Sequence, residues 1–592
     1  MQAEEHYDAI VVGAGAGGLT AACVAAAEGL KTLLVEKSPL VGGTTAISGG
    51  MVWIPANPKM AAAGIEDSVE NAHRYLDLAA PPTREPAARE AFLARGNEAL
   101  EYLEARTSLR LRPVLNYPDY YPELPGATLG GRVLEPVEFD ARTLGRDFVL
   151  MRWPMREFML FEGMMVARAD LPHFRAALSS PRSAARVLRL VAGYAVQRLT
   201  APRGTRLVLG NALVGHLLKS ALDLKVSLRL DASVTQLKMR EGAVAGVEIE
   251  SEGKYEMIAA RAGVVLATGG FSHSAVLRPQ LLPAQVSSRS PVCTTSSGDG
   301  LRIGLAAGGT IGTHNTNNAF WAPVSHFRRA DGSVCVFPHT VVDRGKPGLI
   351  AVTRQGARFT SEAVPYHEFV LAMFRANREG EANPAFLLCD RMSLWQYGLG
   401  AVRPFTLGLS KHLASGYLTR ASTIAELAAR LEIDAARLER SVATYNEDAR
   451  RGVDSQFGLG GDAYQRFLGD AHHRPNPCMR PIEAAPFFAI RLAPSDLGTV
   501  AGLLTDGTAR VLDAYARPVP NLYACGNDMN SIMDGAYPAP GITLGPALVF
   551  GYIAGRAMAG PFRMPRELES GSDQTTPPTR DTLTLGGTIN PA

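Results

Sequence analysis

The first 36 residues alternate between apolar runs and a glycine-rich break. Residues 7–12 (YDAIVV) form a short, almost wholly apolar run, which is typical of a strand buried on both faces. A glycine-rich stretch follows at 13–18, and then an alanine-rich stretch at 19–29 that favours a helix. Residues 31–36 (KTLLVE) predict a second strand that ends in an acid. The pattern therefore predicts a strand–helix–strand unit with a glycine turn at its first corner.

Two later stretches continue this pattern far along the chain. Residues 263–270 (GVVLATGG) form an apolar run that ends in glycines, and residues 502–527 carry short apolar runs that close at Gly526-Asn527. These two stretches resemble the second strand and the closing strand of the nucleotide domain in large FAD-dependent oxidoreductases. The resemblance implies an α/β fold in which separated segments build one Rossmann-like domain. The intervening chain would form an inserted α+β catalytic (cap) domain, in which residues 423–451 have helical spacing. We assign 1–311 and 495–560 to the Rossmann-like domain, 312–494 to the cap, and the polar, Pro- and Thr-rich 561–592 to a flexible tail.

Composition and charge narrow the class of protein. The chain has 592 residues, 46% hydrophobic and 20% charged, which suits two or three packed domains. Its 60 basic and 57 acidic side chains leave a net charge of +3, which gives no reason to expect a nucleic-acid partner. The six cysteines and 12 histidines lack paired or metal-binding spacing, so neither a disulfide framework nor a metal site is expected. The acidic N-terminus is unlike a signal peptide and no apolar stretch is long enough to span a bilayer, which predicts a cytoplasmic enzyme.

The glycine turn has the spacing that binds a dinucleotide. Gly13 permits the tight turn, Gly15 lets the backbone approach a pyrophosphate, and Gly18 allows the helix to pack closely. The helix N-terminus would face the phosphates, and Glu36 would accept hydrogen bonds from the adenosine ribose. No other GxGxxG follows an apolar run, so a second, NAD(P) site is not expected. Electrons would then leave to an external acceptor.

The Gly-, Thr- and Ser-rich loop at 42–50 resembles the loop that large FAD-dependent oxidoreductases lay along the diphosphate and the flavin. With segments 263–270 and 502–527, it makes the chain similar to the fumarate reductase/succinate dehydrogenase flavoprotein superfamily. The resemblance implies FAD, held non-covalently because the flavin-linking histidine of some members would fall near Gly43, where there is none. The residues assigned to FAD are Gly13, Gly15, Gly18, Glu36, Lys37, Gly43, Thr44, Thr45, Ser48, Gly49, Gly50, Thr268, Gly269, Gly270, Gly526, Asn527, Thr543 and Leu544.

Within this superfamily the chain most resembles the 3-ketosteroid Δ1-dehydrogenases. Four stretches carry the likeness: the loop at 42–49, YPDYY at 117–121, VPYHEF at 364–369 and AYPAPGITLG at 536–545. The family often has glycine where this chain has Ala539, a change we expect to be tolerated because neither proposed contact uses that side chain. The resemblance implies FAD-dependent 1,2-desaturation of a 3-ketosteroid, with a quinone or a dye-like molecule as the external electron acceptor.

The resemblance also implies roles for four residues. Tyr537 O–H and Gly541 N–H would hold the ketone oxygen as enolate charge develops. Tyr366 would be the base that takes the C2 proton, and Tyr120 would assist it by hydrogen bonding. A free tyrosine titrates near ~10, so such a base needs a lowered pKa or a proton relay. Tyr121 adjoins Tyr120 and could exchange roles with it, and a tyrosine beside proline is also a common, half-buried turn residue.

Three other interpretations stay open. A fumarate reductase-like enzyme would carry a flavin-side segment of the type GxNRxxGNS, where this chain has GAYPAPGITLG, a neutral segment better suited to an apolar ketone. A 3-ketosteroid 4(5α)-dehydrogenase would remove the 4,5 hydrogens, although the YPxPG segment favours the 1,2 position. A flavoprotein that only transfers electrons or binds steroid would keep the fold without the chemistry.

Residues 151–203 form a basic insert in which arginines alternate with apolar side chains. Between Arg152 and Arg206 there are ten arginines, no lysine and three acids, a local charge of +7. A helix predicted at 183–199 places Arg186, Arg189, Gly193 and Gln197 on one face and Val187, Leu188, Val191, Tyr194 and Ala195 on the other. An arginine-flanked apolar face can lie in a bilayer interface, or it can pack on the enzyme as an ordinary cap helix. The insert thus leaves peripheral contact with the inner face of the membrane as one of two alternatives.

Overall fold

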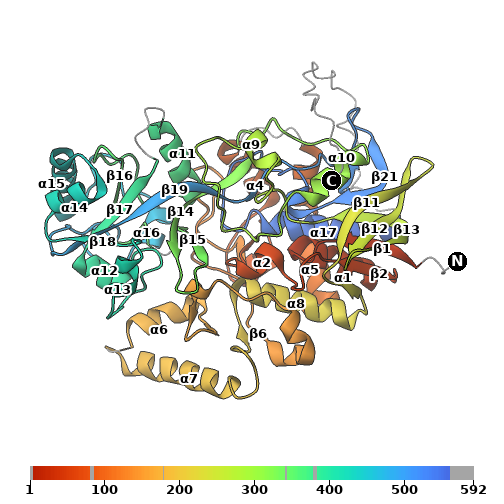
Figure 1. Ribbon diagram of the computed structural model, residues 1–592, viewed down its shortest axis with the longest axis horizontal. Coiled ribbons are helices and arrows are strands. Elements are labelled where there is room, and N and C mark those ends of the chain that lie inside the picture. The colour runs from red at the N-terminus through yellow and green to blue at the C-terminus, as the bar shows by residue number, and fades with distance from the viewer. Residues whose placement is uncertain (1–4, 81–85, 178, 341–342, 378–382, 561–592) are drawn as a thin grey trace.

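Two β-sheets, one mostly parallel and one antiparallel, organise the computed structural model (Figure 1). The structure describes residues 5–80, 86–177, 179–340, 343–377 and 383–560. The tail expected at 561–592 therefore lies outside the described residues.

The mostly parallel sheet has eight strands, drawn from three distant parts of the chain. β1 pairs in parallel with β2 and β13, and β13 pairs in parallel with β21. All four residues of β2 are buried, as expected for a strand covered on both faces. The expected Rossmann-like sheet of separated segments is confirmed. Its strands are β1 (His6–Val12), β2 (Thr32–Val35), β10 (Ser227–Arg229), β11 (Ser233–Arg240), β12 (Ala243–Ser251), β13 (Lys254–Leu266), β20 (Arg510–Leu512) and β21 (Pro518–Ala524).

The turn at Gly13 joins this sheet to its first helix. Gly13 has a φ of +105°, and a Cβ there would lie 2.2 Å from the carbonyl oxygen of Ala267, so only glycine fits. The helix that follows packs against the last described helix of the chain, and a Cβ on Gly551 would lie 2.6 Å from the carbonyl oxygen of Gly17. Helices of this domain are α1 (Ala16–Ala27), α2 (Gly43–Ile47), α3 (Pro58–Ala62), α4 (Val69–Ala79), α5 (Pro86–Arg106), α8 (Leu209–Asp223), α9 (Leu277–Leu281), α10 (Asp299–Ala306) and α17 (Leu544–Ala559).

The second sheet has six strands and forms the additional domain on the left of Figure 1. Its central strand, β19, pairs with β17 and β18 at one end and with β14 at the other. The additional α+β domain that the fold class predicts is thus present, and its sheet is antiparallel. Its elements are β14 (Ala319–Arg328), β15 (Val334–Pro338), β16 (Leu349–Val352), β17 (Ala385–Asp390), β18 (Thr419–Ala421), β19 (Phe487–Thr499), α11 (Tyr366–Ala376), α12 (Arg391–Tyr397), α13 (Ser410–Ala414), α14 (Ile424–Leu431), α15 (Ala435–Arg451) and α16 (Ala463–Leu468).

The helix expected over 423–451 is in fact two helices. Glu432 follows α14 with a left-handed φ of +58°, and the side chain of Asp434 then caps the N-terminus of α15 by accepting a hydrogen bond from the Arg437 N–H. The helical stretch expected there is thus present. It is broken at a left-handed residue that is neither glycine nor asparagine, so the sequence does not mark the break.

The basic insert contributes α6 (Leu171–Arg175) and α7 (Pro181–Gln197), which project at the lower edge of Figure 1. Tyr194, which we expected on an apolar face with Leu188, instead packs inward and donates a hydrogen bond to the Phe161 carbonyl at 2.7 Å. Arg186 also turns inward, to Asp170. Consequently Leu188, Val196 and Leu199 stay exposed, at 70%, 66% and 82% of their surface. No helix in the described part of the chain is long and apolar enough to cross a membrane.

Several short strands complete the description. A three-stranded sheet pairs β5 with β3 and β4, and two strand pairs, β6 with β9 and β7 with β8, lie in or beside the insert. These strands are β3 (Val52–Trp53), β4 (Leu111–Pro113), β5 (Val133–Pro136), β6 (Phe139–Asp140), β7 (Met159–Leu160), β8 (Met164–Met165) and β9 (Arg206–Leu207).

Candidate active site

Three of the predicted catalytic residues lie in one buried cluster. Tyr366 begins α11, Tyr537 precedes α17, and Tyr120 lies in the loop between β4 and β5. The ring centroids of Tyr366 and Tyr537 are 5.0 Å apart, and Tyr120 lies 5.8 Å from Tyr366 and 5.7 Å from Tyr537. None of the three is more than 6% exposed. The two domains therefore bring together tyrosines from three distant segments.

Further aromatic rings, which the sequence did not single out, surround this cluster. Tyr464 on α16 stacks 4.7 Å from Tyr120, and Phe320 on β14 lies edge-on 5.2 Å from Tyr537. Tyr117 of the YPDYY motif packs against Phe467 at 4.4 Å. The YPDYY motif was the available signal for Tyr117, whereas Tyr464 and Phe320 lie outside the four motifs. The result is a largely aromatic, uncharged wall.

The structure distinguishes Tyr120 from its neighbour Tyr121. The Tyr121 hydroxyl donates a 2.8 Å hydrogen bond to the carboxylate of Glu368, away from the other tyrosines. The Tyr120 hydroxyl is buried and has no hydrogen-bond partner among the described residues. Its backbone N–H donates to the Pro538 carbonyl at 2.9 Å, which fixes this loop against the segment that carries Tyr537. Tyr120 is therefore the tyrosine of the pair that joins the cluster.

Gly541 is held where its amide can serve as a donor. It has a φ of +93°, and a Cβ there would lie 2.8 Å from backbone atoms of Met51 and Trp53. Its carbonyl accepts the Trp53 N–H at 3.2 Å and the Gly545 N–H at 2.8 Å. Among the described residues its own N–H donates to no recorded acceptor, and Pro538 and Pro540 beside it have no N–H to compete. A close approach to β3 thus requires glycine here.

A cluster of buried charged side chains holds the loop of Tyr120 and the segment of Gly541 in place. Asp119, the residue before Tyr120, accepts hydrogen bonds from the Trp53 indole at 2.9 Å and the Thr128 N–H at 3.0 Å. Arg132, which is fully buried, pairs with Asp119 at 2.9 Å and with Asp67 at 2.7 Å. Since Trp53 also contacts Gly541, the cluster links the position of Tyr120 to that of the Gly541 amide. No sequence pattern pointed to this role for Asp119.

Burial dominates the electrostatics of the tyrosines. It raises the pKa of Tyr366 well above its usual value; the nearby Tyr537 adds to the rise and Tyr120 opposes it. Burial likewise raises the pKa of Tyr120 well above its usual value, and raises that of Tyr537, where Tyr366 and Thr543 act in the opposite direction. The structure therefore does not supply the lowered pKa that a tyrosine base needs. A relay through neighbouring hydroxyls is the remaining route.

The predicted dinucleotide residues converge on the N-terminus of α1. The Thr45 hydroxyl accepts the Ala16 N–H at 3.1 Å, which sets the loop at 42–50 against the glycine turn. Glu36 is 8% exposed and accepts hydrogen bonds from the Ala14 N–H at 2.8 Å and the Ser38 N–H at 3.0 Å. Lys37 instead directs its ammonium group to Asp299 at 2.5 Å. Gly15 stays open: the nearest atom to a Cβ built there is the Thr45 hydroxyl, at 3.9 Å.

A buried aspartate that the sequence did not single out joins the other two nucleotide segments. Asp528 accepts hydrogen bonds from the Thr268 N–H at 2.5 Å, the Thr268 hydroxyl at 3.0 Å and the Gly270 N–H at 2.9 Å. It is fully buried and follows Gly526 and Asn527 directly. The segments at 268–270 and 526–527, predicted separately, are therefore held together by one carboxylate.

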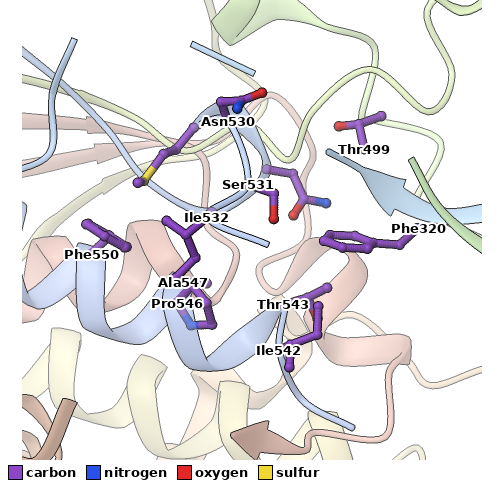
Figure 2. Close-up of a pocket in the computed structure, with 13 residues that line it drawn as sticks. Phe320, Thr499, Asn530, Ser531, Ile532, Ile542, Thr543, Pro546, Ala547 and Phe550 are labelled. Carbon is purple, nitrogen blue, oxygen red and sulfur yellow. The ribbon is translucent and has the colours of Figure 1, made fainter. Parts of the chain in front are cut away.

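Figure 2 shows a small pocket between Phe320 and the N-terminus of α17. Thr543, Ile542 and Pro546 line one side, and Thr499 at the end of β19 lines the other. The Thr499 hydroxyl is buried without a partner among the described residues. A long helix with no acid in its first turn directs its positive dipole end toward this space. These features, with the open cradle at Gly15, fit a flavin dinucleotide.

The fold and this site define an FAD-dependent oxidoreductase. A family model described as FAD binding domain matches residues 8–544. A 4-oxocyclohex-2-ene-1-carboxylate 5-dehydrogenase of Sinomonas cyclohexanicum is 37% identical, covering 93% of each chain. A 3-oxosteroid 1-dehydrogenase of Mycobacterium tuberculosis (strain H37Rv) is 34% identical, covering 93% of this chain and 98% of the relative. The crystal structure of 3-ketosteroid Δ1-dehydrogenase from Sterolibacterium denitrificans, in complex with 1,4-androstadiene-3,17-dione, superposes with a TM-score of 0.88 at 36% identity, covering 94% and 99%.

The chain belongs to this family of FAD-binding flavoproteins, in the group of dehydrogenases that act on CH–CH bonds beside a ketone. The expected FAD cofactor and α/β fold are confirmed by these likenesses. Non-covalent attachment and the contacts of individual residues with FAD stay predictions.

Proposed function

We propose that the protein is a 3-oxosteroid 1-dehydrogenase, which introduces a 1,2 double bond into a 3-ketosteroid. The observation that carries the proposal is the contact of the buried rings of Tyr120, Tyr366 and Tyr537. Four residues after Tyr537, the Gly541 N–H donates to no acceptor among the described residues. The 34% identical 3-oxosteroid 1-dehydrogenase and the 36% identical solved structure support it.

The chemistry follows from the roles of these groups. Tyr537 O–H and Gly541 N–H donate hydrogen bonds to the ketone oxygen. They stabilise the enolate charge that develops on this oxygen as the proton leaves C2. Tyr366, in its deprotonated form, takes that proton, and the Tyr120 O–H assists it by donating a hydrogen bond to the Tyr366 phenolate oxygen. Bound FAD supplies the acceptor for the hydride from C1. The electrons then pass to an external acceptor of the quinone or dye type.

The charges around the site favour an apolar ketone over a carboxylate-bearing substrate. Arg344 is buried and donates to the carbonyls of His339, Glu362, Val364 and Thr340. Arg132 is paired with two aspartates, and Arg168 with Glu135. Each of these guanidinium groups already has acceptors. The name of the 37% identical relative implies a substrate with a carboxylate for that enzyme. A substrate carboxylate would find no unpaired guanidinium group among these three arginines.

We further propose that the insert contacts an anionic membrane surface, which would shorten the path of a poorly soluble sterol. The exposed Leu188 and Val196 lie on α7 with the exposed Arg182 and Arg189. The exposed Arg198 and Leu199 follow the C-terminal end of this helix directly. Apolar side chains flanked by arginines suit the interface of a bilayer. Trp153 and Phe161, 40% and 62% exposed, extend the apolar surface of the insert.

An anaerobic half-reaction tests the proposed chemistry. The purified holoenzyme is mixed with a 4-ene-3-ketosteroid while the visible flavin band is followed. We expect bleaching and recovery of the 1,4-diene, and roughly 10²- to 10⁴-fold slower bleaching in Tyr366→Phe. Tyr121→Phe is the matched control, since its hydroxyl contacts Glu368, and should reduce flavin at the normal rate. No bleaching with short- and long-chain ketosteroids would overturn the proposal, and bleaching with 4-oxocyclohexenecarboxylate alone would favour the second type of substrate.

A further inference from the structure

The residue after Tyr366 carries a buried polar atom that the proposed chemistry does not use. His367 is 1% exposed, and its ring lies 6.1 Å from the ring of Tyr537. Its Nε2 has no hydrogen-bond partner among the described residues. An unpaired buried polar group costs about 1–3 kcal/mol, so a native structure seldom keeps one without a use.

The other ring nitrogen fixes which proton His367 carries. Its Nδ1 accepts the backbone N–H of Trp321 at 3.1 Å. A nitrogen that accepts a hydrogen bond has no proton of its own, so in the neutral ring the proton sits on Nε2. Burial lowers the pKa of His367 to about 3, which keeps the ring neutral at any working pH. His367 is therefore a neutral donor through Nε2–H.

A bulge in the cap sheet explains why this geometry is rigid. The pairing of β14 with β19 shifts register between Phe320 and Trp321, so the Trp321 N–H is available to a side chain. The His367 ring accepts a hydrogen bond from this N–H and so connects the first turn of α11, which begins at Tyr366, to β14. Phe320, on the other side of the bulge, packs on Tyr537. The imidazole is thus held between the strand and the tyrosine that we assign to the ketone.

We infer that His367 Nε2–H is a third donor to the ketone oxygen of the bound ligand, beside Tyr537 O–H and Gly541 N–H. The inference rests on the proposed function, because it assumes that a ketone binds at Tyr537. An enolate oxygen has three lone pairs and can accept all three donors. A neutral donor adds no charge to the site, in keeping with its aromatic, uncharged wall.

The variant His367→Asn separates the two roles of the side chain. The amide oxygen of asparagine can still accept the Trp321 N–H, but no atom reaches the Nε2 position. Binding to the oxidised holoenzyme is followed by the shift of the flavin spectrum. The probes are 1,4-androstadiene-3,17-dione, which keeps the 3-ketone, and the matched steroid without the 3-oxygen. We expect the variant to bind the ketone roughly 2- to 12-fold more weakly and the 3-deoxy ligand with unchanged affinity.

Each result decides a different question. Equal losses for both ligands, or no loss for either, would overturn the role of His367, whereas failure of the wild-type protein to bind any 3-ketosteroid would overturn the proposed function instead. If His367→Asn does not retain flavin, His367→Gln is the second variant, because its amide nitrogen reaches the Nε2 position. Near-normal ketone binding is expected for it, and a loss equal to that for the 3-deoxy ligand would contradict the inference.

Discussion

The Tyr366 hydroxyl sets the pH dependence that we expect of the enzyme. Burial raises its pKa well above the usual value, so only a small fraction is ionised near neutrality. A base acts in its deprotonated form, and below its pKa that fraction grows about tenfold per pH unit. We therefore expect the rate of flavin reduction by a 3-ketosteroid to rise with pH through the neutral and mildly alkaline range, measured by anaerobic stopped-flow absorbance.

The residual rate in Tyr366→Phe should lose this rise, because the variant has no hydroxyl to ionise at that position. A wild-type profile that is flat up to strongly alkaline pH would contradict the assignment of the base. Glu368 beside it is bonded to Tyr121 and stands outside the cluster.

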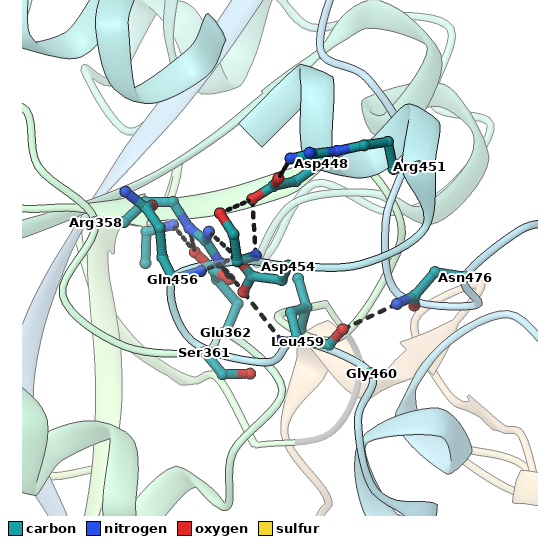
Figure 3. Close-up of polar contacts among 12 residues, drawn as sticks. Arg358, Ser361, Glu362, Asp448, Arg451, Asp454, Gln456, Leu459, Gly460 and Asn476 are labelled. Atoms are coloured by element: carbon teal, nitrogen blue, oxygen red, sulfur yellow. Dashed lines mark hydrogen bonds and ion pairs between the residues drawn. The ribbon is translucent and has the colours of Figure 1, made fainter. Parts of the chain in front are cut away.

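At the scale of elements, a buried ion network holds the loop that leads into α11. Arg358 pairs with Glu362 at 2.7 Å and with Asp454 at 2.9 Å, and all three side chains are at most 1% exposed (Figure 3). Glu362 also accepts the Ala351 N–H of β16 at 3.0 Å. The Ser361 hydroxyl donates to Gln465 on α16 at 2.8 Å. The loop before Tyr366 and the helix that carries Tyr464 are thus fixed to each other.

We expect Asp454→Asn to destabilise the protein by about 3–5 kcal/mol, because it removes the charge of one partner from a buried pair. Urea unfolding followed by circular dichroism measures the change. Asp223→Asn is the matched control: it breaks the Lys219–Asp223 pair, in which the aspartate is 55% exposed, and should cost at most about 0.5 kcal/mol. Similar small losses in both variants would show that the network contributes little to stability.

Local patterns predicted the elements that local physics determines. The observed β1, α1 and β2 match the expected strand–helix–strand unit because apolar runs and a glycine turn are properties of neighbouring residues. The inward face of α7 could not be predicted, because it depends on Asp170 and the Phe161 carbonyl, which become partners only in the fold. The role of Asp528 could not be predicted for the same reason, because its partner Thr268 lies 260 residues away in the sequence. Family motifs supplied the three tyrosines. Tyr464 lies outside those motifs, and the contacts of His367, which lies inside one of them, depend on the three-dimensional fold.

At the scale of the whole molecule, α7 lies at the lower edge of the protein (Figure 1). Its apolar side chains Leu188 and Val196 are exposed. We expect the full-length holoenzyme to float with anionic liposomes at low salt, and the combined change Leu188→Ser, Val196→Ser and Leu199→Ser to abolish flotation. Leu407→Ser is the matched control, because Leu407 is 92% exposed in the cap domain, outside the insert. Absence of liposome binding by the wild-type protein would contradict membrane contact. Equal loss in the control would contradict the choice of surface.

The order in which the eight-stranded sheet is encoded has a consequence for how the protein is made. β1 and its glycine turn leave the ribosome before β21, Asp528 and α17, which lie about 500 residues later in the chain. At roughly 5–20 residues per second, the first strand waits about 25–100 s for the partners that complete its domain. A nascent chain cannot hold the flavin during that interval. Flavin binding is therefore expected only after these later segments have emerged, and until then the sheet keeps an unpaired strand edge where β21 will add to β13.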